Sequence, residues 1–92
     1  MYRILYHEKV ITFDIPKLDS GTKRVIKKAI EAKLVSAPEV YGKPLRQTLA
    51  GYRKLRVGDH RIVFKIEKLV VYILIIQHRS SVYKVADSRK RN

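Results

Sequence analysis

The sequence has no cysteine and no tryptophan, and it contains only 4 glycines, 3 prolines and 8 acidic residues among 92. Because cysteine is absent, disulfide bonds and thiol catalysis are excluded, and the composition fits a reducing cytosol. The longest apolar run, residues 69–76, is too short to span a bilayer, and no basic-then-apolar signal opens the chain. The low glycine and proline content argues against a linker or tail, so we expect one globular domain over residues 1–92.

Positive charge is what the sequence has in excess. Lysine and arginine number 21 against the 8 acids, which gives a formal net charge of +13. Such an excess repels itself in the compact state and attracts polyanions. The favoured partners are therefore nucleic acid or an acidic protein, whereas a membrane is disfavoured by the lack of a spanning segment.

The N-terminal half predicts one strand and two helices. Residues 2–7 alternate bulky and polar side chains, which is typical of a strand. Residues 8–15 predict a short helix that Pro16 ends, because the residue before proline avoids the helical region. The clearest helix begins at Asp19 or Ser20 as its cap and ends before Pro38. Its apolar positions recur every three or four residues, at Ile26, Ala29, Ile30 and Leu34, and the lysines Lys23, Lys27, Lys28 and Lys33 fill its outer face.

The C-terminal half predicts a three-strand antiparallel meander over residues 52–57, 60–66 and 69–77, with two-residue turns at Gly58-Asp59 and Glu67-Lys68. An irregular crossing over residues 40–51, with one helical turn at 45–49, precedes it. Residues 80–92 predict a short helix or a frayed basic tail. The fold class is therefore α+β: a small antiparallel sheet, made of the N-terminal strand plus the meander, with two helices packed on one face.

The turn at Gly58-Asp59 determines which side chains share a face of the sheet. On one face it pairs Arg56 with Arg61, Lys54 with Val63, and Tyr52 with Lys65; on the helix-covered face it pairs Leu55 with Ile62, Val57 with His60, and Arg53 with Phe64. The second turn adds Leu69, Val71, Ile73 and Ile75 to the covered face, and Val70, Tyr72 and Leu74 to the charged one. A slip of one residue would bury the cations, so we expect an open face with a cationic centre and an aromatic and aliphatic floor.

The predicted Arg56–Arg61 pair is unfavourable, because like charges directly opposite in a sheet cost up to about 1 kcal/mol. Two interpretations are open. The arginines are either splayed, solvated surface residues bridged by Asp59, or a preformed anion site in which a bound phosphate supplies the missing negative charge. We favour the anion site.

The segment KPLRQTLAGYRKLRVGDHRIVFKI, followed by a hydrophobic strand and HRSSVY, resembles the RelE branch of the RelE/ParE superfamily of toxins. The string Leu-x-Gly-x-x-x-Leu-Arg-x-Gly-Asp-x-Arg is the most specific part of the resemblance. It implies a cytoplasmic type II toxin that is silenced by an acidic, RelB-like antitoxin and needs no cofactor or metal. It also implies ribosome-dependent cleavage of messenger RNA in the aminoacyl site, through attack of the 2′-hydroxyl group.

The resemblance further implies which residues act in catalysis. Arg61 matches the strand arginine, Lys54 and Arg56 match basic residues of the preceding strand, and Tyr83 matches the late tyrosine, with Arg79 as the basic residue before it. Cations around Tyr83 favour its anion, which could serve as the base. Arg61 would stabilise the phosphate in the transition state, with Arg56 or Arg79 assisting, and Lys54 or Arg79 would neutralise the leaving oxygen.

Other residues have less defined roles. His78 is a candidate for acid and base work, since some relatives use a late histidine, whereas His60 is interpreted as a packed imidazole. The residues expected to contact RNA are Tyr52, Lys65, Lys43, Arg46 and Arg53. The alternatives to a nuclease are a ParE-like inhibitor of DNA gyrase, which generally lacks the basic and tyrosine constellation, and a non-catalytic RNA or ribosome binder that stacks bases on tyrosines.

Overall fold

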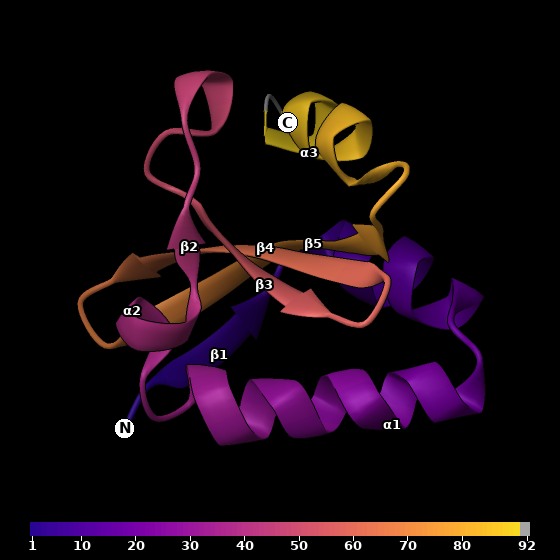
Figure 1. Cartoon of the computed structure of the whole chain (residues 1–92), viewed down its shortest axis with the longest axis horizontal. Helices are drawn as coiled ribbons and strands as arrows, with labels where there is room; N and C mark the ends of the chain where they lie inside the picture. The colour runs from indigo at the N-terminus through magenta and orange to yellow at the C-terminus, as the bar shows by residue number, and fades with distance from the viewer. Residues whose placement is uncertain (91–92) are drawn as a thin grey trace.

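A five-stranded sheet with helical segments on both faces makes up the computed structural model, which describes residues 1–90 (Figure 1). The strands are β1 (Arg3–Tyr6), β2 (Lys43–Pro44), β3 (Arg53–Val57), β4 (His60–Glu67) and β5 (Val70–His78), in the sheet order β1-β5-β4-β3-β2. The predicted α+β class and the β3-β4-β5 meander are confirmed. The prediction of a fully antiparallel sheet is wrong for β1, which runs parallel to β5. Only strands joined by a tight hairpin must be antiparallel, and β1 is separated from β5 by helices and by β2, β3 and β4.

The helices of the N-terminal half cover one face. They are η1 (Val10–Asp14), η2 (Ile15–Lys17), α1 (Ser20–Ala29) and its continuation η3 (Ile30–Leu34). Asp19 caps α1 as predicted, because its side chain accepts a hydrogen bond of 2.7 Å from the Thr22 N–H. The prediction that Pro16 ends the first helix is wrong, since Ile15 is helical (φ −62°, ψ −44°). Proline is tolerated there because it lies in the first turn of the 3₁₀ helix η2, where its missing N–H is not needed.

The remaining helical segments are α2 (Pro38–Tyr41), η4 (Gln47–Leu49) and α3 (Val82–Lys90). The turn η4 confirms the helical turn expected in the crossing segment. The C-terminal segment is the helix α3 rather than a frayed tail, apart from residues 91 and 92, which lie outside the described part of the chain. Figure 1 shows α3 above the sheet, on the face opposite α1. Over residues 1–90, no helix combines the length and hydrophobicity needed to cross a membrane.

Two hydrophobic clusters hold these layers together. The first lies between α1 and the sheet and the second lies between α3 and the sheet. The buried members of the first are Val10, Ile26, Ile30, Leu34, Leu55, Ile62, Phe64, Val71, Ile73 and Ile76; those of the second are Leu49, Val63, Leu74, Ile75, Val82 and Ala86. The charged face is therefore not fully open as predicted, because α3 and η4 cover its aliphatic part.

The register of the sheet follows the prediction up to β4. All pairs expected between Arg53–Val57 and His60–Phe64 are present. The second turn is formed by Lys68 and Leu69, not by Glu67 and Lys68, since Glu67 pairs with Val70. A bulge then leaves Leu74 unpaired between the Val63↔Ile75 and Phe64↔Ile73 pairs. Ile75 consequently faces α3, whereas the even alternation predicted it on the α1 face.

Candidate active site

A row of cations lies on the part of the sheet that α3 leaves exposed. Arg56 and Arg61 are Cα partners on β3 and β4, and Lys54 precedes Arg56 by two residues, so the three side chains share one face. We call Lys54, Arg56, Arg61 and Lys65 the cationic face. The Arg61 Nη1 atom donates hydrogen bonds of 3.0 and 2.9 Å to the carbonyl oxygens of Gly58 and His60. The β3–β4 turn thus holds the Arg61 guanidinium in place, while Arg56 is exposed to solvent.

The helix α3 brings Tyr83 to this row. The Lys54 ammonium donates a hydrogen bond of 3.1 Å to the Tyr83 hydroxyl oxygen and lies 5.8 Å from the centre of its ring. Tyr83 is 45% exposed, so a ligand can reach its hydroxyl group. Two segments that are far apart in the chain therefore place a phenol against a cluster of cations.

A buried ion pair fixes the position of α3. The Arg89 guanidinium contacts the two carboxylate oxygens of Asp14 at 2.5 and 3.0 Å, with side-chain exposures of only 4% and 0%. Asp14 also accepts hydrogen bonds of 2.9 Å from the Ile76 N–H and from the Gln77 side chain. A buried carboxylate is tolerated when its lone pairs are occupied in this way. The Asp14–Arg89 pair therefore ties α3 to η1 and to β5.

The tyrosines at the other end of the cationic face are already engaged by lysines. Lys65 lies 5.8 Å from the ring centre of Tyr52 and 5.7 Å from that of Tyr72, and it forms a 3.5 Å ion pair with Glu67. Lys90 of α3 lies 5.6 Å from the Tyr52 ring centre. Tyr52 is partly buried and also packs against the second hydrophobic cluster, so its ring contributes to the core.

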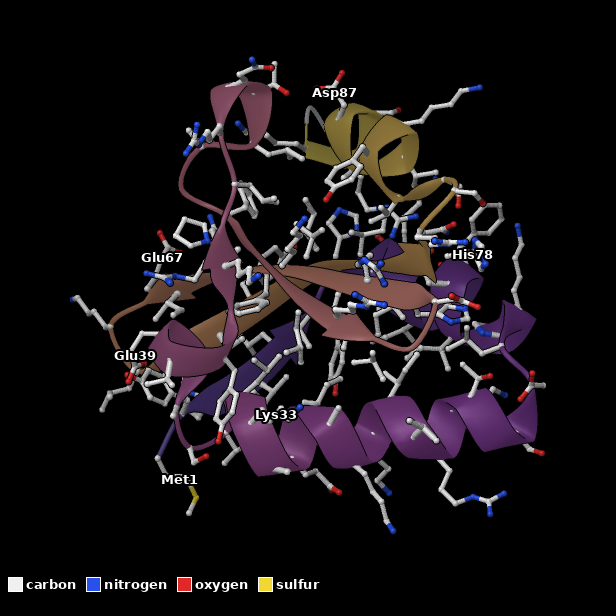
Figure 2. All side chains as sticks on the ribbon, in the orientation of Figure 1. Met1, Lys33, Glu39, Glu67, His78 and Asp87 are labelled. Carbon is white, nitrogen blue, oxygen red and sulfur yellow. The ribbon has the colours of Figure 1, made fainter. Side chains whose placement is uncertain are left out.

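His78 and Arg79 lie apart from the Lys54–Tyr83 contact. His78 is at the end of the sheet opposite Glu67 (Figure 2), where its ring centre is 5.6 Å from that of His60. Both histidines line a pocket of about 500 Å³ beside the start of α1. Arg79 is drawn to the β3–β4 turn, where its Nε atom lies 3.8 Å from the Asp59 carboxylate. Over residues 1–90, no hydrogen bond, ion pair or ring contact joins either residue to Tyr83.

The other predicted RNA contacts are distributed over three places. Arg53 lies on the α1 face and donates hydrogen bonds of 3.4 and 3.1 Å to the carbonyl oxygens of Glu39 and Gly42, so it braces the segment around α2. Arg46 is exposed in the loop before η4. Lys43, on β2, is opposite Lys54 and lies close to the cationic face.

A pocket at the outer edge of β3 contains residues that the sequence did not reveal. We call it the edge pocket; it has a volume of about 330 Å³ and is lined by Lys33, Tyr41, Lys43, Lys54, Leu55, Arg56 and Arg61. The prediction that Lys33 lies on the outer face of its helix is wrong. Lys33 follows the buried Ile30 by three residues and precedes the buried Leu34, a spacing that indicates the inner side.

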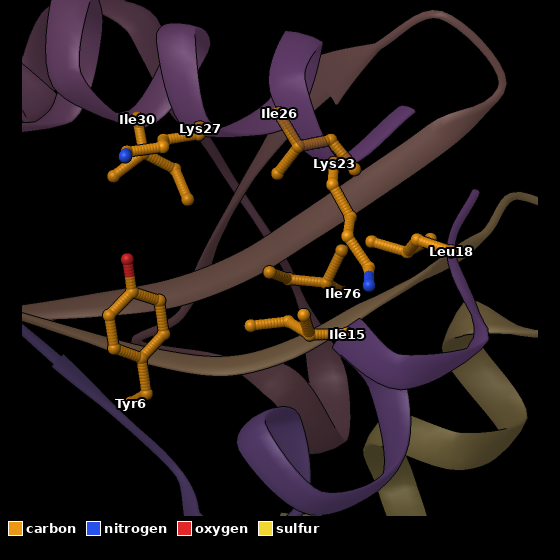
Figure 3. Close-up of a pocket in the computed structure, with 8 residues that line it drawn as sticks. All are labelled: Tyr6, Ile15, Leu18, Lys23, Ile26, Lys27, Ile30 and Ile76. Atoms are coloured by element: carbon orange, nitrogen blue, oxygen red, sulfur yellow. The ribbon is translucent and has the colours of Figure 1, made fainter. Parts of the chain in front are cut away.

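A different, mostly apolar pocket of about 310 Å³ lies between α1 and the first strand (Figure 3). It is lined by Ile15, Leu18, Ile26, Ile30 and Ile76 together with Tyr6, Lys23 and Lys27. Burial and the nearby Glu31 raise the pKa of Tyr6, so its phenol stays protonated at neutral pH. Within residues 1–90, no cluster of three or more His, Asp or Glu residues is arranged to hold a metal ion.

Fold and site together define a small, strongly cationic α+β protein in which a C-terminal helix presents a tyrosine to basic strand residues. The family model described as the ParE toxin of type II toxin-antitoxin systems, parDE, matches residues 12–83, so the chain belongs to this family of toxins.

Curated relatives and solved structures agree with this assignment. The chain is 33% identical to Toxin RelG of Mycobacterium tuberculosis over 77% of its own length and 84% of the relative's. It is 31% identical to Toxin RelE of the same organism, over 85% and 82%. The toxin-antitoxin complex RelBE2 of M. tuberculosis gives a TM-score of 0.78 at 28% identity, covering 86% of this chain and 92% of that one. The isolated RelE toxin of E. coli shares the fold, with a TM-score of 0.72 at 23% identity over 97% and 98%.

Proposed function

We propose that this type II toxin is a ribosome-dependent endoribonuclease that cleaves messenger RNA in the aminoacyl site. The observation that carries the proposal is the 3.1 Å hydrogen bond between Lys54 and Tyr83, beside the paired Arg56 and Arg61. This arrangement places a group that can exchange a proton next to cations that can stabilise a phosphate.

The reaction is an internal phosphoryl transfer. The 2′-oxygen of one nucleotide attacks the adjacent phosphorus, and the bond from phosphorus to the 5′-oxygen breaks, leaving a 2′,3′-cyclic phosphate and a free 5′-hydroxyl. In our assignment Tyr83 accepts the 2′-hydroxyl proton, because the ammonium that donates to its oxygen stabilises negative charge there. Arg56 and Arg61 stabilise the charge on the phosphorane, and Lys54 donates toward the leaving oxygen. The nucleophile is already positioned within the substrate, which removes much of the entropic barrier.

His78 and Arg79 are assigned no direct role in this scheme. His78 lies with His60 near α1, and Arg79 is engaged by Asp59, 3.8 Å away. The sequence predicts that Arg79 helps to stabilise the phosphate or the leaving oxygen. For this role the exposed Arg79 side chain would have to move from Asp59 toward the bound RNA. We assign stabilisation of the reacting phosphate to Arg56 and Arg61, and stabilisation of the leaving oxygen to Lys54.

We further propose that the chain acts in the cytoplasm, where ribosomes are, and that an acidic antitoxin silences it. The similar chain in the M. tuberculosis RelBE2 structure was solved as a toxin-antitoxin complex. A net charge of +13 favours an acidic partner.

The test is translation in a purified system, with mapping of the cut sites in the message. The parent protein should cut within the codon at the aminoacyl site, and Arg61→Ala and Tyr83→Phe should each abolish most of the cutting. Lys28→Ala, on the exposed face of α1, serves as the matched control and should cut as the parent does. Intact message with the parent protein, or full cutting by both site variants, would refute the nuclease assignment.

The rival activity is inhibition of DNA gyrase, as in the ParE-like alternative considered for the sequence. It is tested because the matching family model is described as the ParE toxin. A supercoiling assay with purified gyrase separates the two. We expect no inhibition by this toxin at concentrations that arrest translation. A non-catalytic ribosome binder would arrest translation without cutting, and Tyr83→Phe would leave that arrest intact.

A further inference from the structure

We propose that the side of the edge pocket formed by Lys33, Tyr41 and Lys43 is a second phosphate-binding subsite. It lies beside the cations assigned to the cleaved phosphate and holds a neighbouring phosphodiester group of the same RNA strand. This inference deepens the proposed function and rests on it for the identity of the strand. It assigns Lys33, Lys43 and Tyr41 to substrate binding in addition to the cationic face.

The pocket is formed where the sheet lacks a full outer strand. β2 pairs with β3 only at Lys43↔Lys54 and Pro44↔Arg53, so within residues 1–90 the segment 55–57 has no strand on its outer side. Tyr41, at the end of α2, and Lys33, from η3, close the resulting hollow. Figure 2 shows Lys33 on the side of its helix that faces the sheet.

The lining of the pocket is cationic and has no acidic residue. Its charged members are Lys33, Lys43, Lys54, Arg56 and Arg61. None of the carboxylates in the Lys65–Glu67, Arg79–Asp59 and Asp14–Arg89 ion pairs lines it. Cations gathered in a concave site raise the local concentration of anions and favour binding of a negatively charged group. Arginine and lysine donors of this kind suit phosphate oxygens.

Two features favour an RNA phosphate over a protein carboxylate. Lys54 lines the pocket and also donates to Tyr83, so a ligand in the pocket lies next to the proposed catalytic group. In addition, Tyr41 is 46% exposed, with Lys33 5.5 Å from its ring centre, which gives an aromatic surface beside the cations. Basic grooves with exposed aromatic rings are typical of single-strand binding sites.

The first experiment measures binding of a fluorescent RNA oligonucleotide that carries a 2′-O-methyl group at every position and cannot be cleaved. Lys33→Ala should weaken its affinity roughly tenfold, the effect of one charged contact, and should reduce the magnitude of the salt slope by about 0.7. Lys28→Ala removes the same charge from the exposed face of the same helix and should change affinity less than twofold. Circular dichroism of both variants, and a Lys33→Gln variant, control for folding.

The second experiment locates the phosphate. Methylphosphonate groups, which carry no charge, replace one phosphate of the oligonucleotide at a time. At one position the loss caused by the neutral linkage should disappear in Lys33→Ala, because the contact is already gone. Losses that add to the Lys33→Ala effect at every position would overturn the proposal.

The outcomes also separate this inference from the nuclease assignment, because binding is measured without cleavage. If the message stays intact in translation but Lys33→Ala still weakens RNA binding at one phosphate, the subsite stands and the nuclease assignment fails. If Lys33→Ala leaves RNA affinity unchanged and instead weakens binding of a polyglutamate peptide, the pocket is a protein-binding site and the proposal is wrong.

Discussion

At the scale of single residues, the Arg56–Arg61 pair shows a conflict between stability and binding. The two cations are direct partners across antiparallel strands, and no carboxylate lines the adjacent edge pocket. Like charges in this position destabilise a sheet, so the pair is better explained by a ligand than by the fold.

Replacing one arginine should therefore stabilise the free protein. Arg56→Thr introduces a good strand former and removes the repulsion, so the free energy of unfolding in urea should rise by up to about 1 kcal/mol at low salt. The gain should shrink at 1 M salt, because salt screens the repulsion. Arg3→Thr, on β1, is the control and should show no comparable salt dependence. A destabilised Arg56→Thr at low salt would mean that Arg56 has a favourable role in the fold.

Lys54 and Tyr83 should behave as one unit in catalysis. Tyr83→Phe removes the proton acceptor but keeps the ring, so cleavage should slow by about 10²- to 10⁴-fold, with little change in affinity for non-cleavable RNA. Lys54 acts partly through the Tyr83 oxygen, 3.1 Å away. The double variant Lys54→Met/Tyr83→Phe should therefore be slower than the parent by much less than the product of the two single effects. Fully multiplicative effects in single-turnover cleavage would show that the two residues act independently.

At the scale of secondary-structure elements, the buried Asp14–Arg89 pair should account for much of the docking of α3. Arg89→Met would leave the fully buried Asp14 carboxylate with only neutral donors, from Ile76 and Gln77. Breaking one half of a buried ion pair costs about 3–5 kcal/mol, so urea unfolding should show a loss of that order. Because α3 carries Tyr83, the variant should also lose cleavage. The double variant Asp14→Leu/Arg89→Met should recover part of the stability, since neither charge then remains unpaired.

The start of α1 should show a pH-dependent contribution to stability. The hydrogen bond from the Thr22 N–H holds the pKa of Asp19 below its usual value. A carboxyl group whose pKa is lowered in the folded state stabilises the fold when the pH is above its pKa in the unfolded chain, about 3.9. That stability is lost as the pH falls through the pKa of the folded state. The difference in unfolding free energy between the parent and Asp19→Ala should therefore be full at pH 7 and shrink below about pH 4. Asp19→Asn keeps an uncharged acceptor, so the difference in unfolding free energy between Asp19→Asn and Asp19→Ala should not change with pH over this range.

The same elements show what the sequence can predict. The faces of β3 and β4 could be predicted because Gly58 and Asp59 mark the turn and charged and apolar residues alternate on both sides of it. In β5 the run is aliphatic at nearly every position, so no polar residue marks the bulge at Leu74. The Asp14–Arg89 pair joins residues 75 positions apart, and neither short-range spacing nor composition indicates it. Cap and turn chemistry is local, whereas the position of α3 depends on tertiary packing.

At the scale of the whole molecule, many of the cations behind the net charge of +13 gather on two surfaces. One consists of the cationic face and the edge pocket, on and beside β3 and β4. The other is the exposed side of α1, which includes Arg24 and Lys28. Both contribute to the attraction of a polyanion from a distance, but only cations that touch the strand release its counterions on binding.

The salt dependence of RNA binding should distinguish these two surfaces. The six cations of the cationic face and edge pocket, Lys33, Lys43, Lys54, Arg56, Arg61 and Lys65, predict a slope of log K against log salt of about −4 for a single strand. Replacing Lys33 and Lys65 with glutamine should bring the slope to about −3, since two contacts are lost. Arg24→Gln/Lys28→Gln changes the net charge equally and should leave the slope near that of the parent. Equal slopes for the two double variants would mean that RNA is held by the overall charge of the molecule and not by the surface around β3.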